Sequence, residues 1–210
     1  MSKKGFFITG TDTGVGKTFF SSILMKKYNF DYWKPIQTGK FIENDTFYIK
    51  QNIGIEKNRF HKPTYSFKKP LSPHLASNYE KISINMKKIK KPNSDRPLII
   101  EGAGGILVPL NKKNLLIDLI KKFKFPVIVI SKSILGTINH TLMTLEILKK
   151  NKINIFGVIL NNVKNKKEGY ENKKSIEEYG NIKVLGQISS INHITRKKMK
   201  ALTKKKFISA

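Results

Sequence analysis

The chain has 210 residues and a mass of 24.1 kDa, and 39% of its residues are hydrophobic, enough to bury a core in a domain of ordinary size. It contains no cysteine, which excludes disulfides, thiolate metal sites and cysteine nucleophiles. Its 41 Lys and Arg residues outnumber its 14 Asp and Glu residues and give a formal net charge of +27.

Short apolar runs alternate with helical segments along the chain. We expect strands over residues 5–9, 31–34, 97–101, 127–131, 156–160 and 184–188, and helices over residues 17–28, 115–123, 139–150 and 171–179. Continuous apolar strands separated by helices are typical of a parallel sheet that is covered on both faces. The sequence therefore predicts a doubly wound α/β fold of mostly parallel strands, with sites outside their carboxyl ends.

Two parts of the chain are less regular. Residues 36–96 carry several prolines and few clear strands, so we expect loops and helices over one end of the sheet. The basic tail, residues 196–206, is expected to form a helix face in contact with solvent. Because no repeat or linker is visible, we predict one domain over residues 1–210.

The strongest local signal is the segment 10–18, GTDTGVGKT, between the first strand and the first helix. Such a loop directs backbone N–H groups to phosphate oxygens at the positive end of a helix dipole. Lys17 would reach the β- and γ-phosphates and the Thr18 hydroxyl would bind Mg²⁺. The loop is a variant, because the usual first glycine of such loops is replaced by Thr11. The candidate ATP-binding residues here are Gly14, Val15, Gly16, Lys17, Thr18 and Phe19.

Further candidates end neighbouring strands. Glu101 follows an apolar strand and precedes Gly102, Ala103 and Gly104, and a carboxylate at this point can hold Mg²⁺ beside the phosphate loop. Lys34 ends the second strand and is expected to face the same opening at the carboxyl ends of the strands as Lys17. Asp45, a few residues on, is a candidate for a further Mg²⁺ contact. The phosphate loop and these residues together predict a P-loop NTPase-like fold that binds nucleotide phosphates with Mg²⁺.

Two segments near the carboxyl end of the chain are candidates for a base pocket. The side-chain amides of Asn161 and Asn162 could read a nucleobase, and Ser189 and Ser190 could complete the pocket. Both segments could equally be ordinary turns. The segment Ser72–His74 has no nucleophile-elbow pattern, and the four histidines lack metal-ligand spacing.

The positive charge has two explanations. Phosphate neutralisation in a nucleic-acid complex is one. The other is compositional drift in an A/T-rich genome, which enriches Lys, Asn and Ile everywhere. Only Arg59, Arg96 and Arg196 are arginine, so 38 of the 41 basic residues are lysine, spread over the whole length. Arginine is the usual residue for bidentate phosphate and guanine contacts, so we favour drift and expect no nucleic-acid partner.

The termini and apolar runs predict neither a signal peptide nor a membrane span. The apolar stretch after the basic residues 1–4 covers only residues 5–8, and no run approaches the about 18–20 apolar residues of a membrane helix. We therefore expect a cytoplasmic protein without a membrane partner.

Six stretches of the sequence match one known family: GTDTGVGKT (10–18), KPIQTG (34–39), SPH (72–74), EGAGG (101–105), GTINH (136–140) and GVILNNV (157–163). They appear in the family's order and are spread over most of the chain. In these stretches the chain resembles the dethiobiotin synthetase family of biotin biosynthesis. The resemblance implies an ATP-dependent ligase that uses diaminopelargonic acid and CO₂. A carbamate forms, the γ-phosphate is transferred to it, and the second amine closes the ureido ring of dethiobiotin with release of ADP and phosphate.

The resemblance also implies roles for particular residues. Lys17 and Lys34 would be catalytic and would offset charge on carbamate and phosphate oxygens. Thr18, Asp45 and Glu101 match the Mg²⁺ positions, and Asn161 matches the adenine contact. Thr11 and Thr38 match positions near the substrate's amino and carbamate end. Gly136, Thr137, Ile138 and Asn139 resemble the segment that receives the substrate carboxylate from a neighbouring subunit, which implies a homodimer.

The chain departs from the family at Gly14, where some members carry an acidic residue, and at Ser189, where many carry proline. The main alternative is a partitioning ATPase of the same superfamily that acts on DNA or a membrane. Such proteins typically carry a second lysine early in the phosphate loop, where this chain has Asp12.

Overall fold

The computed structural model describes residues 5–39, 56–191 and 196–208. A seven-stranded sheet has the order β4-β2-β6-β1-β7-β8-β9, and all of these pairings are parallel. Its strands are β1 (Gly5–Gly10), β2 (Asp31–Trp33), β4 (Phe60–His61), β6 (Leu98–Gly105), β7 (Val127–Lys132), β8 (Ile155–Val163) and β9 (Val184–Ser189). A second, parallel pair consists of β3 (Ile36–Thr38) and β5 (Tyr65–Phe67).

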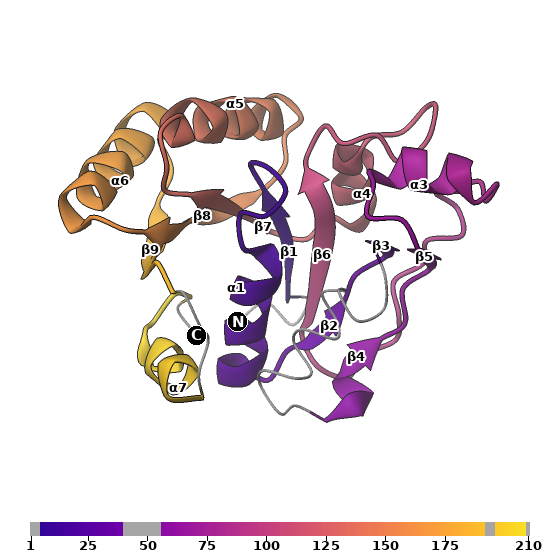
Figure 1. Cartoon of the computed structure of the whole chain (residues 1–210), viewed down its shortest axis with the longest axis horizontal. Helices are drawn as coiled ribbons and strands as arrows, with labels where there is room; N and C mark the ends of the chain where they lie inside the picture. The colour runs from indigo at the N-terminus through magenta and orange to yellow at the C-terminus, as the bar shows by residue number, and fades with distance from the viewer. Residues whose placement is uncertain (1–4, 40–55, 192–195, 209–210) are drawn as a thin grey trace.

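Helices cover both faces of the large sheet (Figure 1). They are α1 (Lys17–Tyr28), α3 (Pro73–Tyr79), α4 (Leu116–Phe123), α5 (Thr137–Lys150), α6 (Lys166–Gly180) and α7 (Arg196–Lys204), with a short 3₁₀ turn at Lys57–Arg59. On one face α1 and α7 lie side by side, and on the other α5 and α6 do. The predicted doubly wound α/β class is therefore confirmed.

The two faces of the sheet explain the continuous apolar strands. Phe6 and Ile8 of β1 pack into the core beneath α1 and α7, whereas Phe7 packs into the core beneath α4, α5 and α6. All three side chains are buried. Since both faces are covered, every position of a central strand favours an apolar residue and no polar alternation appears.

Several element boundaries differ from the sequence-based prediction. The helix over residues 17–28 is confirmed. The helix predicted over 171–179 begins earlier, at Lys166, because the Asn165 side chain accepts hydrogen bonds from the backbone N–H groups of Lys167 and Glu168. The first turn of this helix contains lysines and lacks apolar periodicity, so the start of the helix could not be predicted from hydrophobic spacing.

Two expectations require correction. The described residues of the segment 36–96 form three short strands, and one of them, β4, is an edge of the main sheet. A two-residue strand carries no detectable alternation in its sequence. The basic tail does form a helix, α7, but one side of it is buried. Met199 and Leu202 lie in the core, and the ring of Phe207 packs edge-on against Phe20 with 5.5 Å between centroids.

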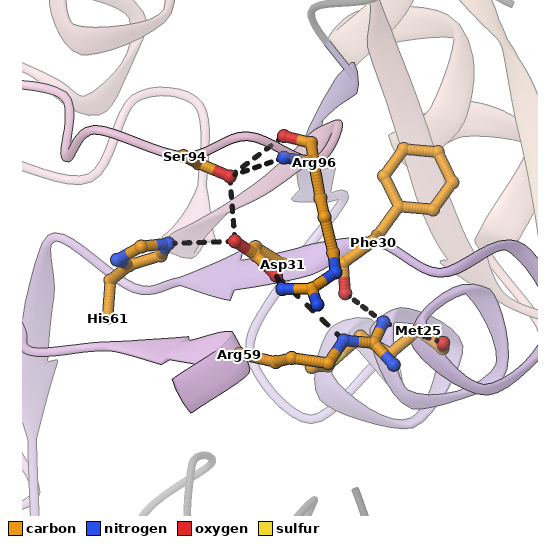
Figure 2. Close-up of polar contacts among 7 residues, drawn as sticks. All are labelled: Met25, Phe30, Asp31, Arg59, His61, Ser94 and Arg96. Carbon is orange, nitrogen blue, oxygen red and sulfur yellow. Dashed lines mark hydrogen bonds and ion pairs between the residues drawn. The ribbon is translucent and has the colours of Figure 1, made fainter. Parts of the chain in front are cut away.

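A buried charged cluster lies at the amino end of β2 (Figure 2). Lys34 follows the other end of this strand. Asp31 is 3% exposed. Its Oδ2 accepts a hydrogen bond from Ser94 Oγ at 2.7 Å and lies 3.3 Å from His61 Nε2. Its Oδ1 lies 3.8 Å from Arg59 Nε and 3.5 Å from Arg96 Nη1. This carboxylate therefore ties β2 to the edge strand β4 and to the segment that precedes β6.

Arg59 connects this cluster to the end of α1. Its Nη2 donates to the carbonyl oxygens of Met25 and Phe30. Burial lowers the pKa of the Arg59 guanidinium, and the Asp31 carboxylate opposes that shift. One planar group thus joins β2 and the carboxyl end of α1, a task suited to arginine rather than lysine.

None of the described helices combines the length with the apolar character that a membrane crossing requires.

Candidate active site

The phosphate loop connects β1 to α1 at the carboxyl end of the central strand. Gly14 and Gly16 both have left-handed backbones, with φ of 70° and 100°. A Cβ on Gly16 would lie 2.1 Å from Asn161 Nδ2, so a side chain here would displace the Asn161 amide and strain a backbone with φ of 100°. The Lys17 ammonium folds back over the loop and donates to the Asp12 carbonyl at 2.9 Å. The loop is therefore compact, and its shape depends on glycine.

A buried carboxylate, Glu101 of β6, forms the centre of the site. It is 1% exposed. Its Oε1 accepts a hydrogen bond from Thr18 Oγ1 at 2.8 Å and lies 3.4 Å from Lys34 Nζ. Its Oε2 accepts a hydrogen bond from Ser21 Oγ at 2.8 Å. Residues from β6, from the end of β2 and from α1 thus converge on one carboxylate.

Ser21 was not among the residues singled out from the sequence. It follows Lys17 by four residues and Thr18 by three, so helical spacing brings all three to the same face of α1. This helical spacing is the sequence signal that points to Ser21. However, a serine within a helix often bonds to its own backbone, so the spacing alone does not indicate a role in the site.

A cavity of about 550 Å³ opens beside this cluster. Its lining includes most of the predicted phosphate and catalytic residues, together with one wall from the region between β5 and α3. The lining residues are Thr13, Gly14, Gly16, Lys17, Thr18, Phe19, Lys34, Thr38, Pro70, Leu71, Ser72, Pro73, Glu101, Ala103, Gly104 and Val108. Lys17, Lys34 and Thr38, predicted separately from three segments, therefore share one cavity.

Other predicted residues lie around or behind this cavity. Val15 is buried beneath the loop. Gly102 faces the core, where a Cβ would lie 2.9 Å from Leu116 Cδ2. Thr11 lines an adjacent groove of about 420 Å³, together with Leu107, His140 and Met143 among others. Asp45 falls outside the described residues.

The candidates for a base pocket lie on the β8 and β9 side of the phosphate loop. Asn161 Nδ2 donates to the Val15 carbonyl at 2.8 Å, so this amide supports the loop directly. Asn162 has a left-handed backbone, with φ of 59°. Ser189 is exposed at the end of β9, and the Ser190 N–H donates to the Val163 carbonyl at 2.9 Å. None of these four residues lines the cavity around Glu101.

The predicted substrate segment 136–139 forms the start of α5. Gly136 and Asn139 are exposed and Ile138 is half-buried. The Thr137 hydroxyl is directed inward, 2.7 Å from Ser131 Oγ. A role for Thr137 in substrate binding would therefore rest on its backbone. These four residues do not line the cavity that contains Lys34, whereas the next residue, His140, lines the groove that contains Thr11.

The residues around Glu101 are suited to a hard divalent cation. The Thr18 hydroxyl and the Glu101 carboxylate are oxygen donors, which Mg²⁺ prefers. Within the described part of the chain, no three His, Asp or Glu side chains cluster as an all-protein metal cage would require. Mg²⁺ usually binds through one or two protein oxygens together with substrate phosphates, and this donor set fits that pattern.

The fold and the site define a P-loop ATPase-type α/β protein, and comparisons with known proteins agree. A family model described as an AAA domain matches residues 4–198. An ATP-dependent dethiobiotin synthetase from Paramagnetospirillum magneticum is 43% identical over 91% of both chains. Another, from Lawsonia intracellularis, is 44% identical over 91% of this chain and 90% of its own. The chain therefore belongs to the ATP-dependent dethiobiotin synthetase family, whose members are ligases.

Solved structures support the fold alone. A putative plasmid partition protein from Borrelia burgdorferi B31 matches with a TM-score of 0.57 and 14% identity, covering 97% of this chain and 98% of that one. The partitioning ATPases thus share the architecture. The sequence relatives favour the synthetase family, which the motifs had indicated.

Proposed function

We propose that the cavity between the phosphate loop and Lys34 binds MgATP and the carbamate of diaminopelargonic acid, and that the ureido ring of dethiobiotin is closed there. The single observation that carries this proposal is the convergence of Lys17, Lys34 and Thr38 with Glu101 around one cavity. Two cations beside a phosphate loop suit a reaction in which negative charge gathers on phosphate and carbamate oxygens.

The reaction needs no nucleophile from the protein. One substrate amine adds to CO₂ and gives a carbamate. A carbamate oxygen then attacks the γ-phosphorus of ATP, ADP leaves, and a carbamic–phosphoric anhydride forms. The second amine attacks the carbamate carbonyl, closes the ring and expels phosphate. The absence of cysteine from the chain is compatible with this route.

The chain's own residues would bind and orient the reacting groups. Lys17 would exchange its contact with the Asp12 carbonyl for phosphate oxygens. Lys34, which is 8% exposed, would lie beside the carbamate and the transferred phosphoryl group. Thr38, which lines the same cavity, would also contact the substrate. Preorganised charges of this kind are usually the largest contribution to catalysis.

Thr18 and Glu101 would hold Mg²⁺, with Asp45 as a third candidate from the sequence. A bound Mg²⁺ would neutralise charge on the ATP phosphates. Asn161, Asn162, Ser189 and Ser190 remain candidates for contacts to the adenine. We also infer that the protein acts in the cytoplasm, where ATP is supplied.

We further propose a homodimer in which the start of α5 from one subunit completes the site of the other. Four apolar side chains are more than one-third exposed near this helix: Leu107, Ile134, Leu135 and Met143. Leu107 and Met143 also line the groove that contains Thr11. An exposed apolar surface next to a ligand groove is typical of an interface between subunits.

The reaction can be tested by measuring phosphate release with MgATP and bicarbonate, with and without diaminopelargonic acid, alongside mass detection of dethiobiotin. We expect release that requires the diamine and matches the product one to one. Release without the diamine, or release stimulated by DNA, would instead favour the partitioning-ATPase alternative.

The dimer can be tested by light scattering and by mixing two inactive variants. Lys34→Gln removes the proposed catalytic cation, and Gly136→Val distorts the start of α5, because Gly136 has a φ of 89°. A composite site predicts that the mixture recovers activity, since mixed dimers hold one intact site. A monomeric mass, or a mixture without activity from variants that both remain folded, would contradict the proposal.

A further inference from the structure

A buried serine on α1, Ser21, contacts Oε2 of the carboxylate at the centre of the site, whereas Thr18 and Lys34 contact Oε1. Ser21 and Glu101 are 0% and 1% exposed, respectively. The Ser21 hydroxyl lies 2.8 Å from Glu101 Oε2 and 3.0 Å from the Lys17 carbonyl oxygen. It has one proton and two acceptors, and the charged carboxylate is the stronger acceptor.

The neighbouring serine, Ser22, provides a comparison for the hydrogen bonds of Ser21. Ser22 is also 0% exposed, and its hydroxyl donates to the Phe19 carbonyl at 2.6 Å. That bond to its own helix satisfies Ser22 locally. The carbonyl of Lys17 offers Ser21 the same solution. The additional contact of Ser21 with Glu101 is therefore not needed to satisfy the serine, and it acts on the carboxylate.

We propose that Ser21 is a positioning residue that fixes the Glu101 carboxylate for Mg²⁺-dependent nucleotide binding, an inference that rests on the proposed metal role of Glu101. The terminal torsion of a glutamate has a broad energy minimum, so its two oxygens are oriented by their partners. By holding Oε2, Ser21 keeps Oε1 directed toward Thr18 and Lys34. Thr18 donates its proton to Oε1, and its hydroxyl lone pairs would remain available to hold Mg²⁺.

Removing this donor should loosen the carboxylate without altering the phosphate loop. Residues that orient a metal ligand typically contribute about 10–100-fold to metal affinity or activity. Gly16 and Lys17 would still bind phosphate oxygens in Ser21→Ala, because the serine hydroxyl contacts Lys17 only at its backbone carbonyl within α1, whereas the Lys17 ammonium is directed to the Asp12 carbonyl. The expected defect is therefore confined to the part of nucleotide affinity that Mg²⁺ supplies.

The test compares Ser21→Ala with Ser22→Ala, two neighbouring variants that each remove one buried hydroxyl from the same helix. ADP binding is measured by calorimetry without metal and with saturating Mg²⁺, and thermal unfolding is recorded for both variants. We expect Ser21→Ala to lose about tenfold or more of the Mg²⁺-dependent gain in affinity. Its metal-free affinity should match that of the wild type. Ser22→Ala should keep both affinities, and Ser21→Cys, with its weak S–H donor, should recover part of the gain.

The outcomes separate this inference from the proposed function. A wild-type gain that Ser21→Ala retains in full would overturn the role of Ser21 alone. Equal losses with and without Mg²⁺ would also overturn it, because they would indicate a general disturbance of the loop. A wild-type protein without any Mg²⁺-dependent gain would remove the proposed metal role, and with it the role of Ser21.

Discussion

The ammonium of Lys34 lies 3.4 Å from Glu101 Oε1, and the register of the sheet explains why these residues meet. Trp33 of β2 pairs with Ile100 of β6 in a parallel ladder. Lys34 and Glu101 are the next residues along these two strands, so they leave the ladder side by side. The pairing of β2 with β6 therefore places one cation, Lys34, and one anion, Glu101, next to each other at the carboxyl edge of the sheet.

The first prediction concerns Lys34→Gln. We expect the rate of ring closure to fall by about 10²–10³, since losing one preorganised charge contact costs that much. MgATP binding should be largely retained, because the phosphate loop is intact. Steady-state kinetics and ADP calorimetry measure the two effects, and Lys112→Gln, at an exposed lysine, serves as control. Equal loss of nucleotide binding and turnover would contradict the catalytic role of Lys34.

The second prediction concerns the two loop glycines. Gly16→Ala should abolish ATP binding, because its Cβ would lie 2.1 Å from Asn161 Nδ2 and its φ is 100°. Gly14→Asn should retain binding, since a Cβ there meets no atom within 4 Å and asparagine tolerates a left-handed backbone. Nucleotide calorimetry on both folded variants tests this contrast. Similar affinities for the two variants would show that the loop does not depend on Gly16.

Much of the fold could be predicted from the sequence because its signals are local. Apolar runs marked the central strands, and the segment GTDTGVGKT marked the strand-to-helix turn. β4 was missed, since two residues at a sheet edge carry no periodicity and depend on partners distant in sequence. The buried side of α7 was missed because its lysines dominate the composition, whereas Met199 and Leu202 are only two residues among them.

The candidate site was predictable to a similar extent. Lys17, Lys34 and Glu101 could be placed at one edge because the carboxyl ends of parallel strands meet there. Ser21 could not be assigned, since its contact joins residues 80 positions apart and depends on how α1 packs against β6. The support that Asn161 gives to the Val15 carbonyl was likewise invisible, because it spans 146 positions. The functional roles of these residues remain predictions.

The third prediction concerns nucleic acids. Despite the net charge of +27, we expect only weak binding to duplex DNA, without sequence preference and with a steep loss of affinity as salt rises. Lysines spread over a surface neutralise phosphates but do not read base edges. Titration of two unrelated duplexes at several salt concentrations tests this expectation. A tight, salt-resistant complex with one of them would contradict compositional drift as the origin of the charge.

The fourth prediction concerns Arg59→Lys. Arg59 donates to the carbonyls of Met25 and Phe30 while its Nε faces Asp31, and a lysine ammonium cannot reach all three. We expect a loss of about 2–3 kcal/mol in the free energy of unfolding, since hydrogen bonds to charged groups contribute about 1.5–3 kcal/mol each. For a chain of this length, that corresponds to a melting temperature lower by about 4–12 °C.

The control for this prediction is Arg96→Lys. The Arg96 side chain is 37% exposed and lies 3.5 Å from the same Asp31 oxygen, so lysine can preserve most of its contribution. Thermal and denaturant unfolding of both variants gives the comparison. The Michaelis constants should not change in either variant, because the cluster lies at the amino end of β2 and the site lies at the carboxyl ends of the strands. Equal destabilisation by the two substitutions would show that charge alone, rather than the planar geometry of Arg59, stabilises this edge of the sheet.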